Sequence, residues 1–96
     1  MKDFNVTYWD TYDLFKEYAE LFGKKSLEEQ INKFFKYSYK LEFTKLSARL
    51  YRINKRGGNY DIIYKEKDRG SVGKASGYRM YFYIKRKLNI TKIINV

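Results

Sequence analysis

Apolar side chains in the first part of the chain recur mainly with the period of an α-helix. Residues 4–9 (FNVTYW) differ, because they are aromatic and β-branched, which predicts a short strand. Asp10 or Thr11 is then expected to cap a helix that ends at Gly23. The apolar residues of this segment share one helical face, which predicts that they belong to the core: Leu14, Phe15, Tyr18, Leu21 and Phe22.

A second helix is predicted from the capping-box pattern SLEE (26–29) to about Tyr37, because the serine and the last glutamate have the spacing that satisfies the first amides of a helix. Residues 39–47 follow two periods at once. They alternate like a strand, whereas Phe43 and Leu46, with later apolar residues, also fit a helical face. We therefore leave the structure of residues 39–47 open.

Turn signals in the second half predict antiparallel strands. The segment LYRINKRGGNYDIIY (50–64) has two runs rich in Tyr and Ile around Gly57 and Gly58, which suit the positive φ angles of a hairpin turn. Residues 78–85 (YRMYFYIK) and 90–95 are predicted to form further strands, joined by a tight connection.

These elements predict an α+β fold, in which an N-terminal strand and two helices pack on one antiparallel meander of three to four strands. A chain of 96 residues is expected to form a single domain over residues 1–96. With 44% hydrophobic residues, we expect an ordered globule.

Composition excludes several kinds of chemistry. The chain has no Cys and no His, which removes disulfides, thiolate metal sites and the commonest general base. No apolar run approaches the roughly 18 residues of a membrane span, and the first residues do not resemble a signal peptide. We therefore expect a cytoplasmic protein without a cofactor, a bound metal or a membrane partner.

Charge divides the chain into two halves. Residues 1–48 carry 8 Lys and 8 acids, whereas residues 49–96 carry 13 Lys and Arg against 3 acids, so the net charge of +10 lies entirely in the second half. Such a basic surface attracts phosphate backbones or an acidic protein, although it can also serve solubility alone.

The segment RGSVGKASG (69–77) contains a Gly-Lys pair but lacks the spacing of a P-loop. Asp68 stands where the first glycine is required, and Ala75 stands where a hydroxyl residue is required. We expect residues 70–77 (GSVGKASG) to be a mobile connection between antiparallel strands, in which Lys74 reaches toward a phosphate.

If residues 78–85 form a strand, alternate side chains point to opposite faces. Tyr78, Met80, Phe82 and Ile84 then form a core face. The opposite face combines cations for phosphates with rings for unstacked bases, and consists of Arg79, Tyr81, Tyr83 and Lys85. A tyrosine-rich solvent face without a ligand is the alternative interpretation.

Three short segments resemble the C-terminal sheet of the RelE/ParE superfamily of bacterial toxin–antitoxin toxins: YKEKDR (64–69), SGYRMYFYI (76–84) and ITKIINV (90–96). The resemblance implies a toxin that binds the ribosome and its messenger RNA, cleaves the message without a metal, and is bound by an acidic antitoxin protein. It implies a catalytic role for Lys65, Lys67 and Arg79.

The acid for the leaving group, which the family supplies from a C-terminal tail, falls here to Tyr81 or Tyr83. Nucleic-acid contacts are expected from the other cations and rings of the basic half: Arg69, Lys74, Tyr83, Lys85, Arg86 and Lys87.

A second function fits the same residues. The chain has the properties of a non-enzymatic basic protein of a phage or plasmid, of the anti-CRISPR or regulatory type, that binds nucleic acid or a nucleoprotein complex. A third is an adaptor that binds an acidic protein. The sequence leaves open whether the protein is an enzyme.

Overall fold

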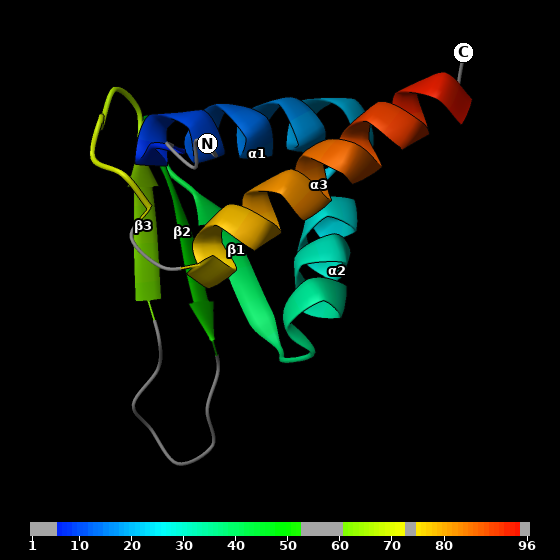
Figure 1. Cartoon of the computed structure of the whole chain (residues 1–96), viewed down its shortest axis with the longest axis horizontal. Coiled ribbons are helices and arrows are strands. Elements are labelled where there is room, and N and C mark those ends of the chain that lie inside the picture. Colours follow the sequence, from blue (N-terminus) through cyan, green and yellow to red (C-terminus); the bar gives the residue numbers. More distant parts are fainter. Residues whose placement is uncertain (1–5, 53–60, 73–74, 95–96) are drawn as a thin grey trace.

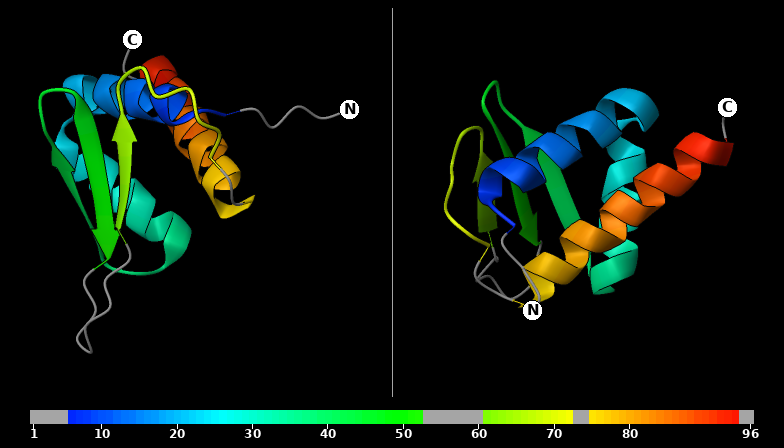
Figure 2. Two further views of the ribbon diagram at one scale, coloured as in Figure 1. Left: turned by 90° about the vertical axis from the view of Figure 1, so that its left-hand side faces the viewer. Right: turned by 45° about the horizontal axis from the view of Figure 1, so that its top comes forward.

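The computed structural model describes residues 6–52, 61–72 and 75–94, which form an α+β fold (Figure 1). Its elements follow one another as α1 (Tyr8–Phe22), α2 (Lys24–Phe35), β1 (Tyr39–Phe43), β2 (Ser47–Arg52), β3 (Asp61–Lys65) and α3 (Ala75–Ile94). The sheet is an antiparallel meander with β2 in the centre. α1 and α2 cover one face of the sheet, and α3 packs against these two helices. The left view of Figure 2 shows the sheet and α3 at opposite sides of the molecule.

The predicted N-terminal strand is not seen. In the described part of 4–9, Thr7 forms only an isolated bridge with Ser71, and α1 begins at Tyr8. Thr7, rather than Asp10 or Thr11, is the N-cap, because its hydroxyl accepts from the Asp10 amide at 3.0 Å and the Asp10 carboxylate accepts from the Thr7 amide at 3.0 Å. This reciprocal pair satisfies two backbone donors.

A loop from the second half of the chain completes the start of α1. The amides of Tyr8 and Trp9 donate to the carbonyls of Gly70 and Asp68, both at 2.9 Å. Helix N-termini leave such amides without partners inside the helix, so the loop takes the place that an anion occupies in a phosphate-binding helix.

α2 begins three residues earlier than the capping-box pattern predicts, because its N-cap is Gly23 and not Ser26. Gly23 has a φ of 97°, which turns the chain directly from α1 into α2, and no side chain caps the new helix. Ser26 therefore already lies inside the first turn and does not cap it. The helix ends at Phe35, where Lys36 takes a left-handed conformation.

Residues 39–47 form β1, a tight turn and the first residue of β2. The predicted hairpin over 50–64 is confirmed by the antiparallel pairing of β2 with β3, in which Leu50 lies opposite Ile62. Its predicted turn, with Gly57 and Gly58, lies outside the described residues.

The predicted strands at 78–85 and 90–95, and the connection between them, are wrong, because all the described residues of these segments belong to the 20-residue helix α3. Met80, Ile84 and Leu88 are buried at four-residue spacing. Phe82 was expected in the core with them but is 46% exposed. Positions two apart share a face in a strand and lie on different sides of a helix.

Residues 70–77 lead from the loop after β3 into α3, so the prediction that they connect antiparallel strands is wrong. The described residues of this segment before α3 are packed rather than loose. Val72 is buried and donates its amide to the carbonyl of Val6 at 2.8 Å. A Cβ added at Gly77 would overlap Cγ1 of Val72, so the absence of a side chain lets α3 approach this segment.

The core joins the buried sides of α1, α2 and α3 to one face of the sheet, with Phe15 and Tyr64 in edge-to-face contact at 5.3 Å between ring centroids. None of the helices in the described part of the chain is long and apolar enough to cross a membrane.

Candidate nucleic-acid interface

The structure places the predicted site residues in four different environments. Lys65, Lys67 and Arg69 are exposed at the end of β3 and in the turn that follows it. Arg79 and Arg86 are exposed on α3. Tyr81 and Lys85 lie on the side of α3 that faces α1. Tyr83 and Lys87 lie on the side of α3 that faces α2. Lys74 lies outside the described residues.

Tyr81 and Lys85 face acids of α1. They line a hollow of about 240 Å³ together with Asp10 and Asp13. Burial raises the pKa of Tyr81 above its usual value, and the charges of the two aspartates raise it further. One turn further along α1 than Asp13, a carboxylate oxygen of Glu17 lies 2.7 Å from Lys92 Nζ. The positive charge on this side of α3 is therefore balanced by carboxylates of α1, and these carboxylates repel a phosphate.

Tyr83 packs against α2. Its ring centroid lies 5.3 Å from that of Phe34, and Lys87 Nζ lies 5.6 Å from the Tyr83 ring centroid. The ring is half-buried, so it contributes to the contact between the two helices.

The residues expected to be catalytic do not all lie together: Lys65, Lys67, Arg79 and Tyr81. Lys65 lies on the face of β3 opposite the buried Tyr64, and that face points away from the helices. Arg79 and Tyr81 belong to α3, which lies on the helical side of the sheet. In a helix, moreover, residues two apart do not share a face.

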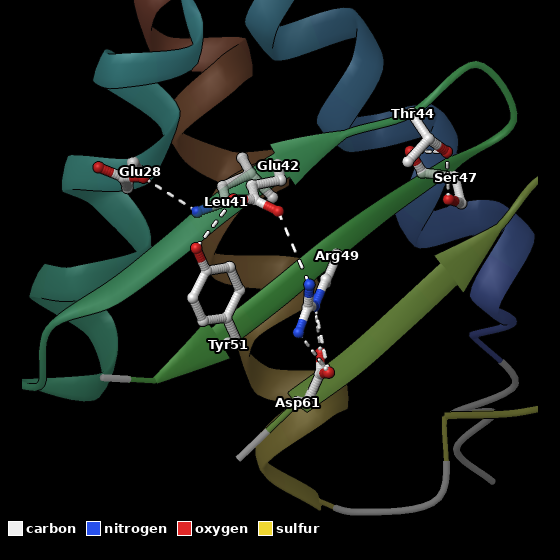
Figure 3. A network of polar contacts seen from close by, with 8 residues as sticks. All are labelled: Glu28, Leu41, Glu42, Thr44, Ser47, Arg49, Tyr51 and Asp61. Carbon is white, nitrogen blue, oxygen red and sulfur yellow. Dashed lines mark hydrogen bonds and ion pairs between the residues drawn. The ribbon is translucent and has the colours of Figure 1, made fainter. Parts of the chain in front are cut away.

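The open face of the sheet has its own ion pairs (Figure 3). Arg49 Nη2 lies 3.1 Å from Asp61 Oδ2, and its Nη1 lies 3.8 Å from Glu42 Oε1. The Tyr51 hydroxyl donates to Glu42 at 2.9 Å. The hydrogen bond to Asp61 raises the pKa of Arg49, and the hydrogen bond to Glu42 raises the pKa of Tyr51. Arg49 is thus engaged by two carboxylates.

A second hollow, of about 270 Å³, lies between α1 and the turn that joins β1 to β2. The rings of Tyr12 and Phe43 line it, with Ala19. Lys16, Lys24 and Lys45 also line it, together with one acid, Glu20. The Tyr12 hydroxyl donates to the Lys45 carbonyl at 3.4 Å, which holds the turn against α1.

This hollow adjoins the cations that follow β3. The Glu66 amide donates to the Leu46 carbonyl at 2.8 Å, so the turn after β3 lies beside the β1–β2 turn. Asp68 uses a carboxylate oxygen to accept from the Gly70 amide at 2.9 Å, and Arg69 stacks over the ring of Trp9 at 4.7 Å. We call the exposed cations of this region the turn-end surface: Lys16, Lys24, Lys45, Lys65, Lys67 and Arg69.

The ion pairs of the described residues involve Arg49 and Lys92, and none involves a cation of the turn-end surface. These side chains are therefore available to phosphates.

Sequence reasoning missed half of this surface, because the first half of the chain has no net charge. A signal was present nonetheless. Asp10, Asp13 and Glu17 repeat at spacings of three and four residues, which puts them on one side of α1, whereas Lys16 lies beyond that row. Charges that cancel in the sequence can thus be separated in space.

Comparisons of the chain with protein-family models, with curated proteins and with solved structures find no match.

Proposed function

We propose that this protein binds single-stranded nucleic acid, RNA in the first place, on the turn-end surface, either as a free strand or within a ribosome or another nucleoprotein complex. The observation that carries this proposal is the hollow of about 270 Å³ with an aromatic lining and three lysines around it. An unstacked base contacts the partly exposed ring of Phe43, whereas the Tyr12 ring, which is 2% exposed, lines the hollow from the core. The phosphates on either side of the base contact lysines.

The arrangement suits a strand without base pairs. Aromatic side chains can stack only on bases that are free of their duplex neighbours, whereas cations contact the backbone of any nucleic acid. From the hollow, the exposed cations continue past Lys45 to Lys65 and Lys67, which provides a path for several successive phosphates.

We favour binding without cleavage, which is the regulatory or anti-CRISPR type of function rather than that of a RelE-like toxin. Cleavage by attack of the 2′-hydroxyl requires a base, an acid and charge stabilisation around one phosphate. Lys65 lies on the face of the sheet that points away from the helices, whereas Arg79 and Tyr81 belong to α3 on the other side, so the four residues do not surround one phosphate.

Binding should depend on salt through the turn-end surface. In the variant Lys45→Gln/Lys67→Asn we expect affinity for a labelled 12-nucleotide RNA to fall about tenfold and the log–log salt slope to decrease by about 1.4, since each phosphate contact of a single strand contributes about 0.7. Asparagine suits position 67 because Lys67 has a φ of 64°. Fluorescence anisotropy measures the RNA affinity and its salt slope. The titrations cover about 50 to 300 mM salt, a range that includes physiological ionic strength.

The matched control is Arg79→Gln/Arg86→Gln, which removes the same charge from α3. This variant should keep the wild-type salt slope. Equal losses in the two variants would show a general attraction by net charge and contradict a defined site.

The aromatic hollow is tested separately. Phe43→Leu keeps a large apolar side chain but removes the ring, and it should weaken RNA binding by roughly 5- to 10-fold, which is near the lower end of measured base-stacking contributions. Leu46→Ser changes an exposed residue of the same turn and should leave affinity unchanged. An oligonucleotide that lacks its bases should bind wild type and Phe43→Leu equally well. If it distinguished them, the ring would act through packing and not through a base.

Cleavage is tested by adding wild-type protein to a translating extract and mapping messenger RNA ends. We expect no new ends. New ends that disappear in Lys65→Ala/Lys67→Ala would overturn the non-enzymatic proposal.

A further inference from the structure

The outer side of α3 carries an exposed row of residues that is unlike the turn-end surface. Phe82, Ile90 and Ile93 are 46%, 43% and 75% exposed, and Arg79 and Arg86 are also exposed. We call this row the α3 seam: Arg79, Phe82, Arg86, Ile90 and Ile93.

The seam lies opposite the buried side of the helix. Its members follow one another at spacings of three, four, four and three residues, so they form one narrow row along α3. The buried residues Met80, Ile84 and Leu88 define the side that packs on α1 and α2. Spacings of three and four residues are those at which one helix packs along another.

From these features we propose that the α3 seam binds an acidic amphipathic helix of a partner protein. α3 contains five cations and no acid, and the two arginines of the seam have no ion pair within the described part of the chain. The complementary helix has apolar residues facing Phe82, Ile90 and Ile93 and two carboxylates, seven residues apart, facing Arg79 and Arg86. Arginine and aromatic residues surrounded by apolar contacts are frequent centres of protein–protein binding energy.

A second copy of this chain is a poor occupant. In an antiparallel pair of α3 helices centred on Arg86, the two Arg86 side chains meet, and in a parallel pair each arginine meets its equivalent. Both arrangements bury like charges against each other, which is strongly unfavourable.

A lipid surface is a poor occupant as well. Helices that lie in a membrane interface keep their cations on the polar side, away from the acyl chains. Here Arg79 and Arg86 stand within the apolar row, so insertion of the isoleucines would take both guanidinium groups into the lipid. A nucleic acid, in turn, would leave Phe82, Ile90 and Ile93 in water.

The experiment uses two synthetic helical peptides of three heptads with leucine along one row. One peptide has two glutamates seven residues apart in that row, and the other has lysines at the same two positions. Isothermal calorimetry with the full chain should show 1:1 binding of the glutamate peptide, about tenfold tighter than the lysine peptide. The charge-reversed variant Arg79→Glu/Arg86→Glu should prefer the lysine peptide, and circular dichroism should show that it is folded.

Two further variants separate the contributions. The variant Ile90→Ser/Ile93→Ser should lower the affinity for both peptides by a similar factor, because it removes apolar contact without changing the charge of the seam. Lys45→Gln/Lys67→Asn should bind the glutamate peptide like wild type, so failure of the seam and failure of the turn-end surface are distinguishable.

Several results overturn the inference. They are no binding of either peptide, equal affinity for both peptides, or a preference that the charge-reversed variant does not invert. Binding to phosphatidylserine vesicles or to the labelled RNA that is lost in the charge-reversed variant, without a peptide preference, would assign the seam to lipid or nucleic acid. Self-association in sedimentation equilibrium that Ile90→Ser/Ile93→Ser abolishes would assign it to a second copy.

Discussion

Gly77 permits a close contact between α3 and Val72 in the segment that precedes it. A helix normally gains about 1 kcal/mol when glycine is replaced by alanine. Here the added methyl group meets the buried side chain of Val72, so Gly77→Ala should instead lower the free energy of unfolding by about 1–3 kcal/mol. Urea denaturation monitored by tryptophan fluorescence measures the change.

The companion variant Val72→Ala removes the obstructing methyl groups. Gly77→Ala should then be nearly neutral or stabilising in the Val72→Ala background, which a double-mutant cycle detects as a coupling between the two positions. Simple additivity would mean that the two residues do not touch.

Tyr81 provides a residue-scale prediction about pH. Its raised pKa means that the folded protein favours the neutral phenol, so its stabilising effect is complete below the ordinary tyrosine pKa of about 10 and is lost as pH rises through the higher folded value. Asp13→Asn should lower the Tyr81 pKa toward its ordinary value. NMR of tyrosine labelled with ¹³C at Cζ follows this titration. The Tyr81 signal is identified as the one that is missing from the spectrum of Tyr81→Phe.

Glu29→Gln, on the exposed side of α2, is the control and should leave that titration unchanged. An unaltered Tyr81 pKa in Asp13→Asn would show that the Asp13 charge does not contribute to the raised pKa.

Among the elements, α3 shows most clearly where sequence reasoning went wrong. Aromatic and β-branched residues in YRMYFYIK favour a strand, and alternation assigns Met80 and Ile84 to the core. Both are buried, but positions four apart share a face in a strand and in a helix alike, so they do not discriminate. Phe82 does discriminate, because a strand places it on the same face as Met80 and Ile84, whereas in the structure it is 46% exposed. Leu88, which the prediction placed in a connection between strands, is buried.

The helices and strands that were predicted correctly had a single consistent period or a turn signal. The apolar row of α1 is largely buried, as expected, and only Leu21 and Phe22 at its end are partly or mostly exposed. The β2–β3 hairpin was predicted from its flanking runs. The start of α2 was not predicted. It depends on the φ of Gly23, which is set by the packing of α1 against α2, and the SLEE pattern contains no information about that packing.

The outer edge of β1 is covered by side chains of α2. The amides of Tyr39 and Leu41 donate to Asn32 Oδ1 at 2.7 Å and to Glu28 Oε2 at 2.9 Å. Glu28→Ala should lower the free energy of unfolding by about 1–2 kcal/mol, because it leaves the Leu41 amide without its acceptor. Urea denaturation tests this.

Glu28→Gln retains an acceptor and should cost less, whereas Glu29→Ala on the exposed side should change stability by less than about 0.5 kcal/mol. Equal effects of Glu28→Ala and Glu29→Ala would mean that helix propensity, and not the strand edge, is responsible.

For the molecule as a whole, the division of charge in the sequence does not match the division in space. Part of the positive charge of α3 faces the carboxylates of α1, where Lys92 pairs with Glu17. Cations from the nominally neutral first half, such as Lys16 and Lys45, join those that follow β3. The charge of the sequence predicts a partner with phosphates or acidic groups, but the position of the candidate surface depends on which helices are neighbours.

The turn-end surface and the α3 seam use different elements, which gives a prediction for the whole chain. Saturation with the glutamate peptide should change RNA affinity by less than about twofold, since ligands couple only when they alter a shared equilibrium. Anisotropy titrations with and without the peptide measure this. Mutual exclusion would mean that the two ligands compete for one surface.

The loop that closes the start of α1 has a consequence for synthesis of the chain. α1 is made before the sheet, but the carbonyls that accept from Tyr8 and Trp9 belong to Gly70 and Asp68, which follow the sheet in the chain. Contacts so distant in sequence form late and slowly. The first amides of α1 therefore stay open to solvent in the nascent chain until the segment between β3 and α3 has been translated.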